Sequence, residues 1–230
     1  MPAPRKVVFR NDNLYHIYNR GVEKMETFTD LYEYRRAIQT IDYYRFSNPP
    51  QRFSKFLQTE QQERELMLKN MKKEGDQLVN IVAFCLMPNH FHFILQQLMD
   101  GGVQKFLANF SNSYTRYFNT RHERNGYLFQ GNFKAVFVED NEQLLHLSRY
   151  IHLNPVTASM IDINDLEQYQ WSSYRSYLGK KDNIGHDFVL NNIIIEQFKP
   201  RGEYLKFIHD QADFIKSFEE LCPVTIDSPQ

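Results

Sequence analysis

The sequence predicts an α+β fold in which a split βαββαβ order gives a four-stranded antiparallel sheet with helices on one face. Residues 79–97 hold two apolar runs of strand length around Met87-Pro88-Asn89, a turn signal, which predicts a β-hairpin. Segments with helical spacing precede and follow this hairpin, and a further strand pattern lies at each end of the series. In this topology the first and third strands are central neighbours, and one sheet face is left for a substrate.

The first strand and the first helix have clear boundary signals. Residues 13–20 alternate and are rich in aromatic and β-branched side chains, which favours a strand. Thr29 or Asp30 can cap a helix that runs to about Arg45, because apolar residues recur there at helical spacing. The helix is expected to end before Asn48-Pro49-Pro50, which interrupts the pattern.

A charged insert separates the first helix from the hairpin. Residues 48–76 combine many Gln, Glu and Lys residues with a weak apolar stripe, so one or two solvated helices are expected there. After the hairpin, Gly101-Gly102 opens a helix that is expected to continue to about Asn119. Its apolar stripe follows the i, i+3, i+4, i+7 spacing of an amphipathic helix, at Val103, Phe106, Leu107 and Phe110.

The second half of the chain completes the sheet and then becomes acidic. Residues 126–139 predict a strand bent at its glycines, and residues 140–153 predict a helix that Pro155 ends. We expect residues 1–180 to form one domain and residues 181–230 to form an acidic C-terminal extension. The extension is expected to hold a strand and a helix, near residues 188–195 and 203–220.

The composition permits nucleic-acid binding and argues against membrane insertion. The chain has a net charge of −1, but residues 182–230 carry nine acidic and four basic residues, so the preceding part has a charge of +4. No apolar run approaches the ~18–20 residues of a membrane span, and no signal peptide is evident. Cys85 and Cys222 form no disulfide framework, so the reducing cytoplasm is the expected location.

Two histidines on the second strand of the hairpin are the first candidate site residues. His90 and His92 lie two apart, so both imidazoles project from one face of the strand while Phe91 and Phe93 project from the other. On a sheet face open to solvent, the two imidazoles could hold a cation and leave positions for substrate oxygens. Histidines at this spacing are also found as structural residues, so the pair alone leaves both interpretations open.

The helix near residues 140–153 carries a polar stripe that could complete such a site. His146, Tyr150 and Asn154 are spaced by four, so they lie on one side of the helix beside its apolar face. Tyr150 is a candidate nucleophile, Asn154 a candidate metal ligand and His146 a candidate auxiliary base. The alternative is that Tyr150 is an ordinary tyrosine at the edge of the core, since the chain has 14 tyrosines.

Several cations are candidates for contact with a phosphate backbone. Arg20 lies at the end of the first strand, where His16, a second auxiliary candidate, shares a face with Tyr18. Basic and aromatic residues are interleaved after the hairpin, a pattern that suits a nucleic-acid strand because cations meet phosphates and rings stack on bases. The candidates in this part of the chain are Arg116, Arg121, Arg124 and Lys134.

Four motifs in order resemble a known family. PNHFHFIL, YTRYFNTRHERNGYLFQGNFKAVFVED, LSRYIHLNPV and WSSYRSY are similar to segments of the REP-associated tyrosine transposases. These are single-tyrosine HUH transposases of the insertion-sequence 200 type, and the resemblance runs from about Leu14 to Tyr177. It implies a ferredoxin-like fold and cleavage of single-stranded DNA.

The resemblance also implies a role for each candidate site residue. His90 and His92 match the metal ligands of the HUH motif, Tyr150 matches the nucleophile and Asn154 matches the third ligand, where relatives often carry glutamine. The implied cofactor is Mg²⁺ or Mn²⁺, and the implied partner is single-stranded DNA that forms a hairpin, in the nucleoid of a prokaryotic cytoplasm. The insert 48–76 and the extension 181–230 exceed the minimal family domain and could add DNA contacts or mediate a homodimer.

Three other functions stay open on the sequence alone. A metal-dependent nuclease that uses water would cleave DNA without a covalent intermediate. A domesticated hairpin-binding protein would recognise the DNA and leave it intact. A small-molecule metalloenzyme on the same sheet would need an enclosed apolar pocket instead of an open basic groove.

Overall fold

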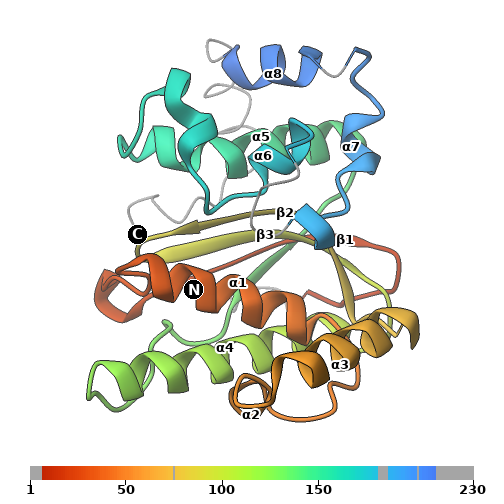
Figure 1. Ribbon diagram of the computed structural model, residues 1–230. Coiled ribbons are helices and arrows are strands. Elements are labelled where there is room, and N and C mark those ends of the chain that lie inside the picture. The colour runs from red at the N-terminus through yellow and green to blue at the C-terminus, as the bar shows by residue number, and fades with distance from the viewer. Residues whose placement is uncertain (1–6, 75, 181–185, 201, 211–230) are drawn as a thin grey trace.

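A four-stranded antiparallel sheet lies at the centre of the computed structural model (Figure 1). The described residues are 7–74, 76–180, 186–200 and 202–210. The strands are β1 (Leu14–Arg20), β2 (Val79–Met87), β3 (His90–Gln97) and β4 (Lys134–Phe137). Their order in the sheet is β2-β3-β1-β4, so the first and third strands are central neighbours, which confirms the predicted topology.

Helices cover both faces of the sheet. Figure 1 shows α1 (Leu31–Tyr44) and α4 (Gly102–Arg121) on one face and α5 (Asn141–Thr157) on the other. The alternation along β3 serves both layers, since Phe91 and Phe93 pack in the core with α1 and α4 while Ile94 packs in the core with α5. The face that was predicted to lie open to a substrate is therefore covered by α5.

Two long helices, one on each face of the sheet, begin with the same capping arrangement. Asp30 caps α1 by accepting from the backbone N–H groups of Tyr32 and Glu33, and Asp140 caps α5 by accepting from that of Gln143. In each helix the side chain three residues after the cap reaches back to the backbone N–H that precedes the cap. Glu33 accepts from Thr29 at 2.7 Å, and Gln143 accepts from Glu139 at 2.6 Å.

Helix α5 does not end before Pro155 as the sequence predicted. It continues to Thr157 with Pro155 inside its last turn. Pro155 has no N–H for the carbonyl of Ile151, so the helix loses one backbone hydrogen bond, but the residues that follow still close the turn. Ala158 donates to the carbonyl of Asn154 at 3.0 Å, and Met160 donates to that of Pro155 at 2.9 Å. Asn154 is consequently helical and sits one turn after Tyr150.

Two of the remaining predicted elements differ from those in the structure. The strand predicted for residues 126–139 pairs with the sheet only over Lys134–Phe137, and the strand predicted for 188–195 is replaced by a short helix, α7. The insert holds two helices, as expected, but the first is not simply solvated, because Phe53 and Phe56 are buried in the core. The helix predicted near residues 203–220 is observed over Gly202–His209, and residues 211–220 lie outside the described residues. These further helices are α2 (Phe53–Phe56), α3 (Gln61–Glu74), α6 (Tyr174–Tyr177), α7 (Asn192–Ile195) and α8 (Gly202–His209). Three 3-10 helices span Val22–Lys24, Ile163–Gln168 and His186–Phe188.

Within the described ranges, no helix is both long enough and apolar enough to cross a membrane.

A buried histidine on α5 joins the C-terminal helices to the sheet. The two ring nitrogens of His152 lie 2.8 Å from the Tyr204 hydroxyl and 2.7 Å from the Ser173 hydroxyl. Ser173 in turn bonds the backbone of Phe84 in β2, and all of these side chains are buried. Burial lowers the pKa of His152 to about 3 because the interior disfavours the charged ring.

This low pKa gives an expected pH dependence of stability. The unfolded chain takes up a proton on His152 near pH 6.5, whereas the folded chain does so only near pH 3, so stability is fully present above pH 6.5 and is lost as the pH falls. The slope is up to about 1.4 kcal/mol per pH unit for each such histidine. Urea unfolding between pH 7.5 and pH 5 should show that the free energy of unfolding falls as the pH falls. His152→Gln should make this pH dependence weaker by an amount that corresponds to the uptake of up to one proton.

Candidate active site between the sheet and helix α5

The structure brings His90 and His92 together with Tyr150 and Asn154, two of the three residues of the polar stripe on α5. His90 and His92 project from β3 toward α5, and their ring centroids lie 5.1 Å apart. The Tyr150 ring stands edge-on to the His92 ring, with centroids 5.3 Å apart, and Asn154 lies beside His90. His16, from the neighbouring strand β1, completes the group. Four predicted site residues and one auxiliary candidate therefore occupy one region.

Both ring nitrogens of His90 face amide oxygens. Its Nδ1 lies 2.6 Å from Oδ1 of Asn89, and its Nε2 lies 3.3 Å from Oδ1 of Asn154. The Asn154 amide is oriented by its other end, because Nδ2 donates to the backbone carbonyl of Tyr150 at 3.0 Å. A neutral imidazole has one N–H, so it can donate to only one of the two oxygens. If Nδ1 donates to Asn89, Nε2 presents a lone pair beside Asn154.

His92 is held in a similar way on its Nδ1 side. Nδ1 of His92 lies 2.9 Å from Nε2 of His16, and the two rings are stacked. Burial and the neighbouring His90 and His16 lower the pKa of His92 well below its usual value, so the ring is neutral at pH 7. In the tautomer that donates from Nδ1 to His16, Nε2 of His92 carries a lone pair. That Nε2 atom is buried and has no hydrogen-bond partner among the described residues.

These donors fit a divalent cation. A metal-binding histidine commonly donates its second N–H to a neighbouring group that fixes the tautomer, and Asn89 and His16 are placed to serve His90 and His92 in this way. The 3.3 Å between Nε2 of His90 and Oδ1 of Asn154 is close to the ~3.0 Å edge of an octahedron with ligands at about 2.1 Å. No group of three or more His, Cys, Asp or Glu that could hold a metal ion occurs in the described ranges.

The site is nearly closed in this conformation. Tyr150 and His90 are each 7% exposed and Asn154 is 3% exposed. These fractions are too small for a phosphate group to contact the phenol and both ring nitrogens together. Access for a phosphodiester therefore requires side chains of this group, or α5 itself, to move.

The predicted cations divide between two places. Arg20 donates to Gln130 at 2.5 Å and is paired in register with His90, and Nζ of Lys134 lies 5.9 Å from the Tyr18 ring, so both belong to the sheet that carries the histidines. The other three lie on or just after α4, beyond the opposite face of the sheet. They are Arg116, Arg121 and Arg124.

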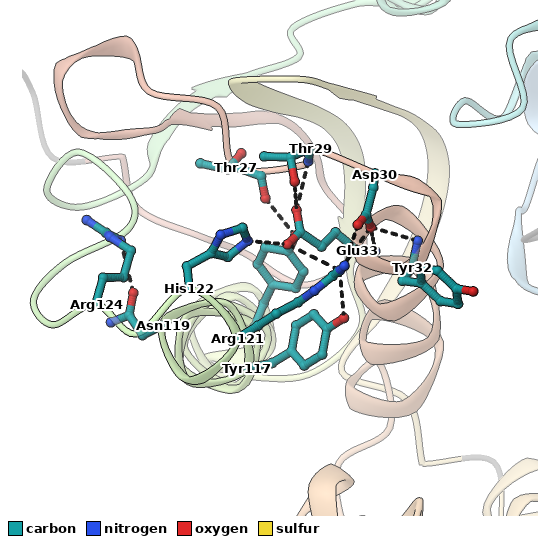
Figure 2. Close-up of polar contacts among 11 residues, drawn as sticks. Thr27, Thr29, Asp30, Tyr32, Glu33, Tyr117, Asn119, Arg121, His122 and Arg124 are labelled. Atoms are coloured by element: carbon teal, nitrogen blue, oxygen red, sulfur yellow. Dashed lines mark hydrogen bonds and ion pairs between the residues drawn. The ribbon is translucent and has the colours of Figure 1, made fainter.

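Two of the α4-side arginines have partners within the protein. Arg121 forms ion pairs with Asp30 and Glu33 of α1, which Figure 2 shows together with His122. Arg124 donates to Asn119 at 2.9 Å. Arg116 is exposed on the surface of α4.

His146 lies apart from the group formed by the other predicted site residues. Its Nδ1 is 3.0 Å from a guanidinium nitrogen of Arg149, and its ring packs near Phe207 of α8. Burial and the Arg149 charge lower the pKa of His146. Its contacts tie α5 to α8, so its predicted role as an auxiliary base gains no support from its position.

Asn89 directly precedes His90 in the PNHFHFIL motif, but it was not among the predicted site residues. Its position in a tight turn gives the signal that could have identified it, because a side chain there can fold back on the first residue of the next strand. The turn is itself held in place. The backbone N–H of Gly21 donates to the Asn89 carbonyl at 2.7 Å, and a Cβ at Gly21 would lie 2.2 Å from the Met25 carbonyl.

Known proteins resemble this chain in sequence and in fold. Residues 43–154 match the family model described as "Transposase IS200 like". Among solved structures, the chain is similar to a REP-associated tyrosine transposase bound to a REP hairpin, at 13% identity over 77% of this chain and 86% of that chain, with a TM-score of 0.50. At this identity the likeness shows the fold alone.

A tRNA(His) guanylyltransferase from Saccharomyces cerevisiae is 9% identical over 97% of this chain and 83% of that chain, with a TM-score of 0.36 that supports no argument. No curated protein matches the chain. The segment matched by the family model contains the β2–β3 hairpin and α4 and ends at Asn154 in α5. Over residues 43–154 the chain is therefore similar to the IS200-like transposases, the family that its motifs resemble.

Proposed function

We propose that this chain is a transposase that cleaves and rejoins single-stranded DNA at hairpins, with Tyr150 as the nucleophile. The family match supports the coarser assignment, a transposase that acts on DNA. One observation carries the finer proposal: Tyr150 and Asn154 of α5 lie against His90 and His92 of β3, elements that are far apart in the sequence. A nucleophile, two imidazoles and an amide in contact are the groups that a metal-assisted attack on a phosphodiester requires.

The side chains around Tyr150 have separable tasks. A Mg²⁺ or Mn²⁺ ion bound by His90, His92 and Asn154 would supply polarisation of the phosphate when present. In the tautomers that donate from Nδ1, Asn89 orients His90 and His16 orients His92, and both Nε2 atoms carry a lone pair. The hydrogen bond from the Asn154 amide to the Tyr150 carbonyl fixes the orientation of that amide relative to the nucleophile's own backbone.

The chemical step transfers a phosphoryl group from one oxygen to another. The Tyr150 phenol oxygen attacks phosphorus in line with the bond to the 3′ oxygen, that bond breaks, and a 5′-phosphotyrosine and a free 3′-OH result. The phenolic proton is released and the departing 3′ oxygen takes up a proton. The phosphodiester is conserved in the new linkage, so another 3′-OH can reverse the attack and join strands without ATP.

The DNA contacts are also part of the proposal. The similar solved transposase is bound to a REP hairpin, and we propose a hairpin in single-stranded DNA as the substrate of this chain. Arg20 and Lys134 lie on the strands next to the histidines and are the candidates for backbone contact near the cleaved bond.

Domain division, assembly and location remain proposals as well. We propose a catalytic domain of residues 1–180 that includes the insert 48–76, followed by the extension 181–230. Ile194, Tyr204 and Ile208 of the extension are buried in the core that contains α5. A homodimer and a place of action in the prokaryotic nucleoid are expected from the resemblance.

Labelled single-stranded hairpins from the DNA that flanks the gene test the proposed function. With Mn²⁺ present, the protein is expected to form a labelled adduct that survives boiling in detergent, and His92→Ala is expected to prevent it. Cleavage without an adduct would indicate a nuclease that uses water. Hairpin binding without nicking would indicate a binding protein, and the absence of both binding and cleavage would favour a small-molecule enzyme.

A further inference from the structure

An arginine-lined groove lies in the helical layer opposite the candidate active site. It has a volume of about 590 Å³ and runs between α1, α2 and α4. Its walls carry four guanidinium groups together with amide, hydroxyl and aromatic side chains, and none of its lining residues is acidic. The four arginines are Arg36, Arg52, Arg116 and Arg121. Only Arg116 and Arg121 were expected from the sequence to contact nucleic acid.

The composition of α4 explains why one wall is basic. Residues 102–121 contain no aspartate or glutamate, although the chain has 28 acidic residues. The core-facing side of the helix carries Phe106 and Phe110, while the groove-facing side carries Asn109, Asn112 and Arg116 at helical spacing. The exposed side of this helix therefore offers donors and positive charge along its length.

Three of the four guanidinium groups have no carboxylate partner among the described residues. Arg121 is bound to Asp30 and Glu33 (Figure 2), whereas Arg36, Arg52 and Arg116 take part in no ion pair in the described ranges. Like charges gathered around a concave surface raise the local concentration of an anionic ligand. The groove thus carries positive charge that the protein itself leaves available.

Arg36 is held in place by aromatic rings. Its guanidinium carbon lies 4.7 Å from the centroid of the Phe53 ring and 4.8 Å from that of Tyr117. Its Nε is buried and has no hydrogen-bond partner in the described part of the chain. A buried N–H group without an acceptor costs free energy, so an anion in the groove would supply the hydrogen-bond acceptor that Arg36 lacks.

We propose that this groove binds the phosphate backbone of single-stranded DNA. Guanidinium groups match phosphate oxygens in charge and geometry, and the amide and hydroxyl side chains of the groove add further hydrogen-bonding groups. The volume is in the ~300–1,000 Å³ range of small-ligand sites, which is room for a short stretch of a single strand. Binding here needs neither Tyr150 nor a cation, so it goes beyond the proposed function. That the bound strand is the substrate DNA rests on that function.

Fluorescence anisotropy with labelled dT20 in the absence of divalent cations tests the groove. The double variant Arg52→Ala/Arg116→Ala removes two exposed cations, and the affinity is expected to fall by about tenfold or more in 50 mM salt. For single strands each neutralised phosphate contributes about 0.7 to the slope of log K against log salt, so the slope should fall in magnitude by about 1.4. The matched variant Lys69→Ala/Lys72→Ala changes the charge equally on α3, outside the groove, and should bind as the unmodified protein does.

The two proposals can fail separately in this design. Tyr150→Phe and His90→Ala should retain dT20 binding, so loss of the covalent adduct does not by itself affect the groove. Unchanged affinity and salt slope in the arginine variant would overturn the inference. An equal loss in the lysine variant, or tighter binding of a 20-base-pair duplex than of dT20, would overturn it as well.

Discussion

Replacing Tyr150 by phenylalanine is expected to abolish the covalent DNA adduct and to lower strand cleavage by at least about 10⁴-fold, because loss of a nucleophile removes the group that forms the intermediate. The substitution deletes one oxygen and keeps the ring. That ring packs edge-on against His92 at 5.3 Å and His16 at 6.2 Å, so the fold and the hairpin affinity should be retained. Gel electrophoresis in detergent with a labelled hairpin measures the adduct, and anisotropy measures the affinity.

A matched tyrosine provides the control for this variant. Tyr127 is 86% exposed on a loop, and Tyr127→Phe makes the same chemical change away from the histidines. This control should form the adduct at the normal rate. An adduct that persists in Tyr150→Phe would assign the nucleophile to another residue, and cleavage that persists without an adduct would indicate attack by water.

Replacing Glu33 by alanine is expected to lower the free energy of unfolding by about 3 kcal/mol. The carboxylate is fully buried, with a relative exposure of 0%, and it accepts from the Thr29 backbone N–H at 2.7 Å and the Thr29 hydroxyl at 2.8 Å. It also contacts His122 at 2.6 Å and Arg121 at 3.4 Å, so it joins the start of α1 to the end of α4 (Figure 2). Removing it leaves a small void and several donors without their acceptor.

The size of the Glu33 effect depends on how exposed its partners are. Arg121 and His122 are about one-third exposed and can turn to water, which places the expected loss at the lower end of the ~3–5 kcal/mol range for breaking a buried pair. Glu33→Gln keeps an oxygen for Thr29 and should lose less. Urea unfolding at pH 7.5 measures both variants, with Glu63→Ala on the exposed surface of α3 as the control. A loss below about 1 kcal/mol in Glu33→Ala would contradict this role.

Much of the sheet could be predicted because local signals and topology agree. The turn at Pro88-Asn89 between two apolar runs defines the hairpin, and the alternation along β3 assigns each side chain to one face. Asp30 was one of the two caps expected for α1, and the structure confirms its role. These features depend on neighbours in the sequence, which is why a pattern of residues reveals them.

The errors arose where distant contacts outweigh a local signal. Pro155 predicts the end of a helix, but the backbone N–H groups of Ala158 and Met160 donate to the carbonyls of Asn154 and Pro155, so the last turn of α5 still forms. The strand expected at residues 188–195 forms α7 instead, and Ile194 and Ile195 are buried against α5 and β2. The sequence of β3 could not predict that α5 covers one face of the sheet. The alternation along a strand shows which side chains share a face, but it does not show which other element packs on that face.

The candidate site shows the same division. The spacing of His90 and His92, and of Tyr150 and Asn154, allowed these residues to be proposed before any coordinates were known. Their roles remain proposals. The arrangement in which Asn89 and His16 hold the two imidazoles depends on a turn and on strand register, and the arginine groove depends on three helices that are distant in sequence.

The central claim is that the phenol of Tyr150 becomes linked to DNA while the neighbouring side chains hold the phosphate group. The most direct measurement is mass spectrometry of the protein after reaction with a hairpin oligonucleotide in Mn²⁺ and digestion with protease and nuclease. We expect the peptide that contains Tyr150 to carry a 5′-phosphonucleotide on that residue. A modified peptide that lacks Tyr150, or complete cleavage of the DNA with every tyrosine unmodified, would contradict the account.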